Sequence, residues 1–144
     1  MRKIEFMNIY FAGSIRGGRG DKELYHRLIE HLKTHGQVLT EHVGDHSLTH
    51  MGEDGPTSEW IYDRDMAWIQ EADVVVAEVT VPSLGVGYEI ARAENLGKPI
   101  LCLWRNDPNR RLSAMIAGSR KIKNVTYDTF EQATQAIDQF IKDL

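Results

Sequence analysis

The chain has 144 residues, of which 42% are hydrophobic, and its 17 basic and 21 acidic residues give a net charge of −4. This length suits one domain with its own core, so we expect a single domain over residues 1–144. The acidic balance argues against general affinity for a nucleic-acid polymer, which requires a basic face. The sequence shows neither a secretory signal nor an apolar stretch near the roughly 18 residues of a membrane span. We therefore expect a soluble intracellular protein, in the cytoplasm or also in the nucleus.

Apolar runs alternate with helical patterns along the chain, which is typical of a parallel sheet covered by helices. A first strand is predicted at residues 8–13, followed by a Gly-rich turn at 14–20. Asp21 can cap the next helix, and a second strand is predicted at 37–40. The polar, turn-rich residues 44–57 are the best candidate for a mobile loop.

The second half of the chain continues this alternation. Ser58 can cap a helix that runs to about residue 71, and the β-branched run at 73–79 predicts a buried strand. The remaining patterns predict a turn at residues 82–85, a helix at 86–96 and a strand at 99–104. A loop at 105–111, a short helix at 112–118, an edge strand at 125–127 and a final helix at 130–141 follow. Five strands and about five helices favour an α/β, flavodoxin-like doubly wound five-stranded parallel sheet with helices on both faces.

In that fold, a crevice opens beyond the carboxyl ends of the first and third strands, where the strand order reverses. The rule points to residues 14–19 and 80–89. The first segment, Ser-Ile-Arg-Gly-Gly-Arg, offers an anion its backbone N–H groups and the side chains of Arg16 and Arg19. It is neither G-x-G-x-x-G nor a P-loop, so dinucleotide or ATP binding is poorly supported. A phosphate site and a solvated glycine turn both remain open.

Two carboxylates point to chemistry in this crevice. Glu89 lies about one turn into a helix and is directed back toward the crevice, although the helix dipole alone also favours a carboxylate there. Asp65 falls on the apolar face of its helix, four residues after Ile61, where it needs a partner or has a raised pKa. A plain helix-packing role for Asp65 is the alternative. Two carboxylates facing one crevice would suit glycosidic chemistry.

Histidines and cysteine give no comparable signal. His42, His46 and His50 are spaced four apart, but Gly44 and the surrounding turns argue against one helix presenting them, so we expect no metal site. The single Cys102 lies in an apolar run and is interpreted as a buried thiol rather than a nucleophile.

Five segments between residues 8 and 128 carry a specific resemblance. In order, they are Ile-Tyr-Phe-Ala-Gly-Ser-Ile-Arg-Gly-Gly-Arg, Val-Leu-Thr-Glu-His-Val, Ala-Asp-Val-Val-Val-Ala-Glu-Val-Thr, Pro-Ser-Leu-Gly-Val-Gly-Tyr-Glu and Leu-Ser-Ala-Met-Ile. Together they closely resemble the nucleoside 2-deoxyribosyltransferase family, and within it the branch that hydrolyses 2′-deoxynucleoside 5′-monophosphates. The resemblance implies release of a free base and 2-deoxyribose 5-phosphate, without a metal or organic cofactor.

The resemblance also implies roles for particular residues. Glu89 would be the nucleophile that forms a covalent deoxyribosyl intermediate, Asp65 would aid departure of the base, and Tyr10 would position the nucleophile and sugar. The implied substrate-binding residues are Gly13, Ser14, Ile15, Arg16, Gly17, Gly18, Arg19, Ser83 and Gly85 around the phosphate, His42 near the base, and Ser113, Ala114 and Met115, which would reach the site of a neighbouring subunit.

The resemblance therefore implies a homodimer that binds a small deoxynucleotide. A deoxyribosyltransferase, in which a second base replaces water, is the first alternative, and the phosphate-binding serines, above all Ser113, favour the hydrolase. A nucleotide-binding sensor without catalysis is the second. The loop at residues 44–57 does not match the family, so the preferred base stays open.

Overall fold

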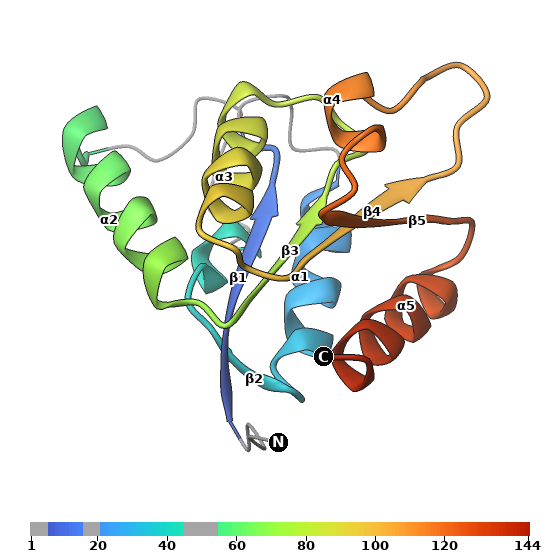
Figure 1. Ribbon diagram of the computed structural model, residues 1–144, viewed down its shortest axis with the longest axis horizontal. Helices are drawn as coiled ribbons and strands as arrows, with labels where there is room; N and C mark the ends of the chain where they lie inside the picture. Colours follow the sequence, from blue (N-terminus) through green and yellow to red (C-terminus); the bar gives the residue numbers. More distant parts are fainter. Residues whose placement is uncertain (1–5, 16–20, 45–54) are drawn as a thin grey trace.

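Five parallel strands in the order β2-β1-β3-β4-β5 form the centre of the molecule (Figure 1). The protein is represented by a computed structural model that describes residues 6–15, 21–44 and 55–144. The strand order reverses beside β1, which confirms the predicted flavodoxin-like doubly wound sheet. The elements are β1 (Met7–Gly13), α1 (Lys22–Leu32), β2 (Gly36–Val38), the 3₁₀ helix η1 (Glu41–Gly44), α2 (Ser58–Glu71), β3 (Val74–Glu78), α3 (Leu84–Asn95), β4 (Ile100–Arg105), α4 (Ala114–Ala117), β5 (Ile122–Tyr127) and α5 (Phe130–Lys142).

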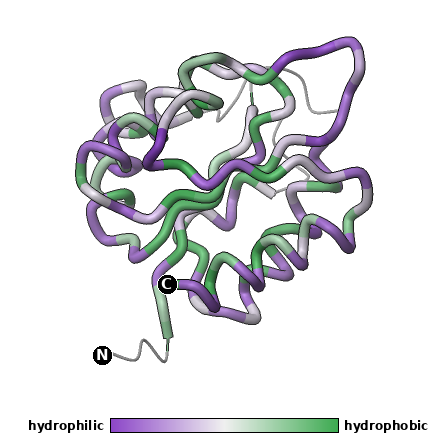
Figure 2. The backbone as a smooth tube through the Cα atoms, turned by 45° about the vertical axis from the view of Figure 1, so that its right-hand side comes forward, coloured by the Kyte–Doolittle hydropathy of each residue, from purple (hydrophilic) through white to green (hydrophobic). Residues whose placement is uncertain are grey.

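The central strands are buried on both faces because helices cover both sides of the sheet. Successive side chains point to opposite faces, so Phe11 packs in the cluster beneath α1 and α5, whereas Tyr10 packs in the cluster beneath α2 and α3. Figure 2 shows the result as a hydrophobic central sheet with more hydrophilic segments around it. This alternation directs Tyr10 to the same layer as the two helices that carry Asp65 and Glu89.

Most predicted elements are confirmed, with differences at their ends. Asp21 occupies the N-cap position of α1 but makes no capping hydrogen bond, because its carboxylate pairs with the Arg105 guanidinium. Thr57, rather than Ser58, caps α2 by accepting a hydrogen bond from Trp60 N. β5 begins at Ile122, three residues before the predicted edge strand, since it pairs with β4 along its length.

The structure tests some of the remaining predictions, and others fall outside the described residues or stay untested. Gly97 follows the C-cap of α3 with a φ of +73°, a conformation that favours glycine, and Cys102 is a buried free thiol, as predicted. Of the predicted loop at 44–57, residues 45–54 lie outside the described residues. No helix within the described ranges is long and apolar enough to cross a membrane. The single-domain assignment and the cellular location stay predictions.

Candidate active site

Glu89 and Tyr10 meet at the carboxyl end of the sheet, where β1 lies beside β3. Tyr10 is 1% exposed in β1, and its hydroxyl donates a hydrogen bond to the Glu89 carboxylate from the first turns of α3. Burial raises the pKa of Glu89 from its ordinary 4.5 to about 7, the Tyr10 hydrogen bond opposes this, and the negative charge of Asp65 reinforces it. Burial, together with Glu89, also raises the pKa of Tyr10 far above 10.0. Tyr10 therefore stays protonated and acts as a fixed donor.

Asp65 has the dedicated partner that its place on an apolar helix face required. Its Oδ1 accepts a hydrogen bond from Arg64 Nε at 2.9 Å, and both side chains are mostly buried. Arg64 Nη2 lies 3.2 Å from His42 Nε2. Because a guanidinium only donates, His42 Nε2 must accept, so this nitrogen carries no proton in that contact. The Arg64–His42 contact joins α2 to η1, and the Arg64–Asp65 contact holds Asp65 within electrostatic reach of Glu89.

Aromatic rings surround this ionic group on α2. Arg64 lies over the rings of Trp60 and Trp68, with its Cζ 5.1 and 4.7 Å from their centroids. These three residues are spaced four apart and share one face of the helix. Tyr62 on α2 and Tyr88 on α3 meet edge to face at 6.1 Å, and both are exposed. A planar base would find stacking surfaces at this position.

A cavity of about 260 Å³ lies between α2 and α3 and brings the reactive groups to one space. Asp65 and Glu89 both line it, together with Ser58, Ile61, Tyr62, Met66, Gly85 and Tyr88. A Cβ placed on Gly85 would lie 3.9 Å from Glu89 Oε1, so the glycine leaves the approach to the carboxylate open. We call this space the Glu89 cavity.

The first predicted phosphate segment is described only in part. Gly13 ends β1, and a Cβ there would approach the Tyr25 ring to 3.0 Å, which gives this glycine a packing role. Ser14 is fully buried, and Ile15 packs against the core beneath α1 and α5. Arg16, Gly17, Gly18 and Arg19 lie outside the described residues, so their predicted phosphate contacts stay predictions.

Ser83 and Ser113 line a second, larger space, whereas Gly85 lines the Glu89 cavity. This groove of about 630 Å³ runs between the β3–α3 connection, α3 and α4, and mostly apolar side chains line it. Ser83 caps α3, Ser113 caps α4, and both border the groove, whereas Glu89 does not. Ala114 and Met115 follow Ser113 in α4 and are exposed. Among the described residues of one chain, therefore, Ser113 and Glu89 line different cavities.

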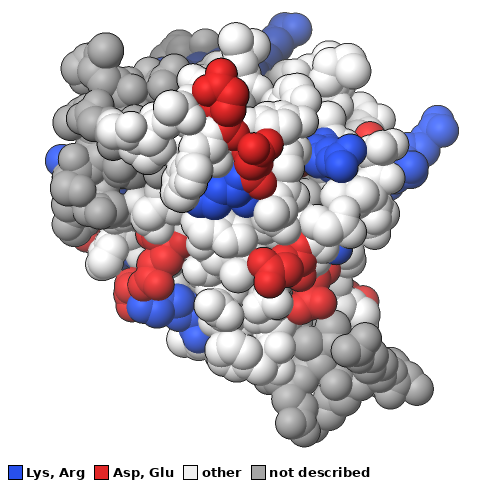
Figure 3. All heavy atoms as spheres, turned by 90° about the vertical axis from the view of Figure 1, so that its left-hand side faces the viewer, with Lys and Arg blue, Asp and Glu red and all other residues white. Residues whose placement is uncertain are grey.

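Charge on the described surface around α2 is divided among small acidic and basic groups (Figure 3). Figure 3 shows the side of the molecule that carries α2, where acidic and basic side chains of the described residues occur in small separate groups among uncharged ones. A nucleic-acid duplex or strand needs a continuous basic surface.

Comparison with known proteins identifies the family. The profile described as nucleoside 2-deoxyribosyltransferase matches residues 9–136. The chain belongs to the nucleoside 2-deoxyribosyltransferase family. A mouse (Mus musculus) protein named 5-hydroxymethyl-dUMP N-hydrolase is 58% identical over 113 residues, which cover 78% of this chain and 65% of that protein. The chain thus spans less than two thirds of that relative's length.

Two further matches cover nearly all of the chain. A Tetraodon nigroviridis protein, also named 5-hydroxymethyl-dUMP N-hydrolase, is 49% identical over 135 residues, covering 90% of this chain and 95% of that protein. The structure of Clostridium botulinum CMP N-glycosidase, BcmB, has a TM-score of 0.68 at 20% identity and covers 92% of this chain and 98% of that one. The second match shows that this family member shares its fold with that glycosidase.

Sequence reasoning named both carboxylates, Tyr10 and His42 but missed several of their neighbours. Arg64, the two tryptophans and the paired tyrosines were not predicted as site residues. Trp60, Arg64 and Trp68 could have been found from their spacing of four, which places them beside Asp65 on α2. Nothing local could have paired Tyr62 with Tyr88, since that contact depends on how α2 and α3 pack.

Proposed function

We propose that this chain hydrolyses the N-glycosidic bond of 2′-deoxynucleoside 5′-monophosphates, releasing a free base and 2-deoxyribose 5-phosphate. The observation that carries the proposal is the Glu89 cavity, where a hydrogen-bonded glutamate and a second carboxylate face the same space. Family membership and the names of the mouse and Tetraodon relatives support this chemistry over other two-carboxylate reactions.

In the first step, one Glu89 oxygen attacks the anomeric carbon of the deoxyribose. The bond from that carbon to the base nitrogen breaks, and its electron pair leaves with the base. Tyr10 holds the Glu89 carboxylate by donating its hydroxyl proton in a hydrogen bond. Asp65 faces the same cavity and aids departure of the base, while its negative charge also favours the oxocarbenium-like transition state.

In the second step, water attacks the anomeric carbon of the deoxyribosyl ester on Glu89. The ester bond breaks, Glu89 recovers its carboxylate, and the sugar phosphate leaves. One proton from the water goes to the solvent or to the departed base. The charge on Glu89 limits the first step, because only the ionised form is nucleophilic and its pKa is raised to about 7.

The substrate class follows from the two sides of the site. Tyr62 and Tyr88, which line the Glu89 cavity and are exposed, offer flat aromatic surfaces for a base. On the other side, the N-terminus of α3 offers backbone N–H groups for a phosphate, and the sequence predicts a second contribution from the segment after β1. Because relatives are named for 5-hydroxymethyl-dUMP, we propose a modified pyrimidine deoxynucleotide as the first substrate to test.

Release of deoxyribose 5-phosphate distinguishes hydrolysis from base exchange, which the family's name makes the second candidate. The protein is incubated with 5-hydroxymethyl-dUMP and the common deoxynucleoside monophosphates, with or without a free acceptor base, and the products are separated by chromatography. We expect free base and deoxyribose 5-phosphate in equal amounts, unaffected by the acceptor. Exchange that outpaces hydrolysis would assign the chain to the transferases.

We also propose that the active unit is a homodimer in which Ser113 of one subunit completes the site of the other. Leu84 at the start of α3 is 97% exposed and Met115 on α4 is 83% exposed, both beside the large groove. Exposed apolar side chains around an apolar groove are typical of an interface with another chain. A second copy seated there would bring a hydroxyl toward the phosphate end of the neighbouring site.

Mixed dimers test this shared site. We expect Ser113→Ala to weaken substrate binding and Glu89→Ala to abolish turnover. Since each mixed dimer would contain one intact site, co-refolding the two variants should restore turnover at substrate concentrations too low to saturate Ser113→Ala. A chain that sediments as a monomer and is fully active would contradict the shared site but leave the hydrolase proposal intact.

A further inference from the structure

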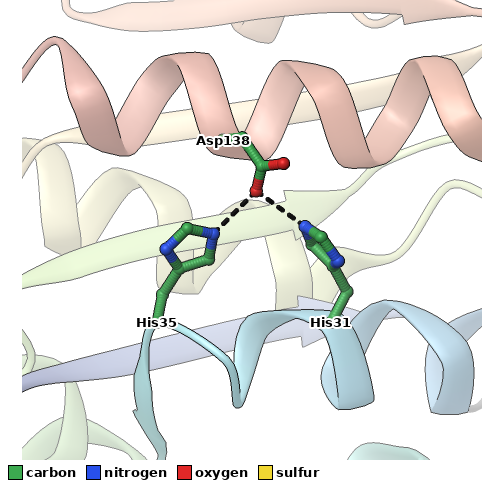
Figure 4. A group of neighbouring side chains, drawn as sticks. All are labelled: His31, His35 and Asp138. Carbon is green, nitrogen blue, oxygen red and sulfur yellow. Dashed lines mark hydrogen bonds and ion pairs between the residues drawn. The ribbon is translucent and has the colours of Figure 1, made fainter.

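Two histidines and an aspartate converge at the end of the sheet opposite the Glu89 cavity. His31 lies in the last turn of α1, His35 immediately precedes β2, and Asp138 lies on α5 (Figure 4). Since parallel strands begin at this edge, the cluster lies away from the crevice at their carboxyl ends. It joins segments that are more than a hundred residues apart in the sequence.

The three side chains point at one another. His31 Nε2 and His35 Nε2 each lie 2.7 Å from the same oxygen, Asp138 Oδ1, and Figure 4 shows both rings turned toward it. The two rings are 5.7 Å apart and nearly perpendicular. One donor atom from each residue lies within 4.8 Å of the others, which within the described ranges occurs at this group alone.

We propose that His31, His35 and Asp138 form a binding site for a divalent zinc ion that joins α1 to α5. Imidazole nitrogens and a carboxylate oxygen are donors that zinc accepts, whereas magnesium and calcium prefer all-oxygen sites. Both imidazoles would bind through Nε2 in their neutral form, and the single carboxylate would leave one positive charge on the site.

The observed separations are close to those of a tetrahedral zinc site. Ligands at about 2.0–2.2 Å from zinc stand roughly 3.3 Å from each other. Each Nε2 now lies 2.7 Å from Asp138 Oδ1, a hydrogen-bond distance, so small side-chain rotations would open the space for an ion. The histidine side chains are 25% and 24% exposed and Asp138 is 52% exposed. Zinc can therefore enter from solvent, and water can complete the coordination.

Such an ion would act on the folding of the chain rather than on its chemistry. The donors come together only when α5 packs beside the end of α1, so zinc would bind the native state and stabilise it. The site does not depend on the proposed hydrolase activity, since its residues share no contact with Glu89 or Asp65 among the interactions described above.

Thermal unfolding with added metal tests the proposal. The tag-free, metal-stripped protein is heated with zinc chloride, with magnesium chloride or with neither. We expect zinc at a hundred times its Kd to raise the Tm by about 5–10 °C. Magnesium should leave the Tm unchanged, and titration calorimetry should give one zinc per chain.

Variants locate the bound ion. His31→Gln, His35→Gln and Asp138→Asn should each abolish the zinc-dependent rise, once their metal-free melting shows that they are folded. His26→Gln is the matched control, since this histidine is also on α1 but beside η1, and its zinc response should persist. A wild-type Tm that zinc does not change would overturn the proposal, as would a rise that survives in all three cluster variants.

Discussion

Two glutamates at the carboxyl end of the sheet have similar environments but different access. Glu78, the last residue of β3, is 0% exposed, and burial raises its pKa as burial raises that of Glu89. Both Glu78 oxygens are occupied, since Oε1 accepts from Thr80 N at 2.7 Å and Oε2 accepts from the Tyr127 hydroxyl. Glu89 lines a cavity instead. A raised pKa alone therefore does not mark a catalytic residue, because a catalytic carboxylate must also be open to substrate.

The sharpest test of this contrast is Glu89→Gln. Removal of the nucleophile should lower kcat/KM by at least about 10⁴-fold, because no covalent intermediate can form. The measurement is base release at pH 8, above the pKa of Glu89. Activity within tenfold of the wild type would show that Glu89 is not the nucleophile.

Asp65→Asn should have the next largest effect. The loss of assistance to the leaving base should lower kcat by about 10²–10³-fold. The charge of Asp65 also raises the pKa of Glu89, so the acidic limb of the pH profile should move to lower pH. A pH series of kcat/KM measures both effects. A change in KM alone would assign Asp65 to substrate binding.

Glu89 and Asp65 also show how much of the site could be predicted from the sequence. Hydrophobic alternation predicted the sheet and its order, and the switch-point rule placed Glu89 in the crevice, because both depend on local patterns. The Arg64 partner of Asp65 and the Tyr62–Tyr88 contact depend on side-chain packing between elements. For the same reason, the sequence did not predict the buried hydrogen bond between Glu78 and Tyr127, which lie 49 residues apart.

Glu89→Gln should also stabilise the protein at alkaline pH. The folded-state pKa of about 7 lies above the ordinary 4.5, so the folded protein holds this proton more tightly than the unfolded chain does. The resulting stabilisation is complete below pH 4.5 and is lost as the pH rises through 7. At pH 8 the ionised wild type should therefore be less stable than the variant by roughly 3 kcal/mol.

Urea unfolding of both proteins at pH 5 and pH 8 measures this difference, which should shrink at the lower pH. An equal difference at the two pH values would indicate that the charge of Glu89 costs no stability. The result would also show how much unfolding free energy the protein loses when Glu89 is ionised, which is the form that its activity requires.

Tyr127→Phe should lower stability and leave chemistry nearly unchanged. The variant removes a donor from the buried Glu78 carboxylate and should cost about 1–3 kcal/mol of unfolding free energy. Denaturant unfolding measures the loss, and kcat/KM per folded molecule should stay within about twofold. A much larger loss of activity at full stability would place Glu78 among the residues that support catalysis.

Tyr10→Phe is the most direct test of how Glu89 is held. The Tyr10 hydrogen bond lowers the pKa of Glu89, so without it the carboxylate ionises at higher pH. We expect the acidic limb of kcat/KM to move up by roughly one pH unit, the equivalent of one hydrogen bond. Activity should therefore fall by about tenfold at pH 6 and by less at pH 9. Because Asp65→Asn should move the limb in the opposite direction, a shift of both variants to the same side would contradict the electrostatic account of the Glu89 cavity.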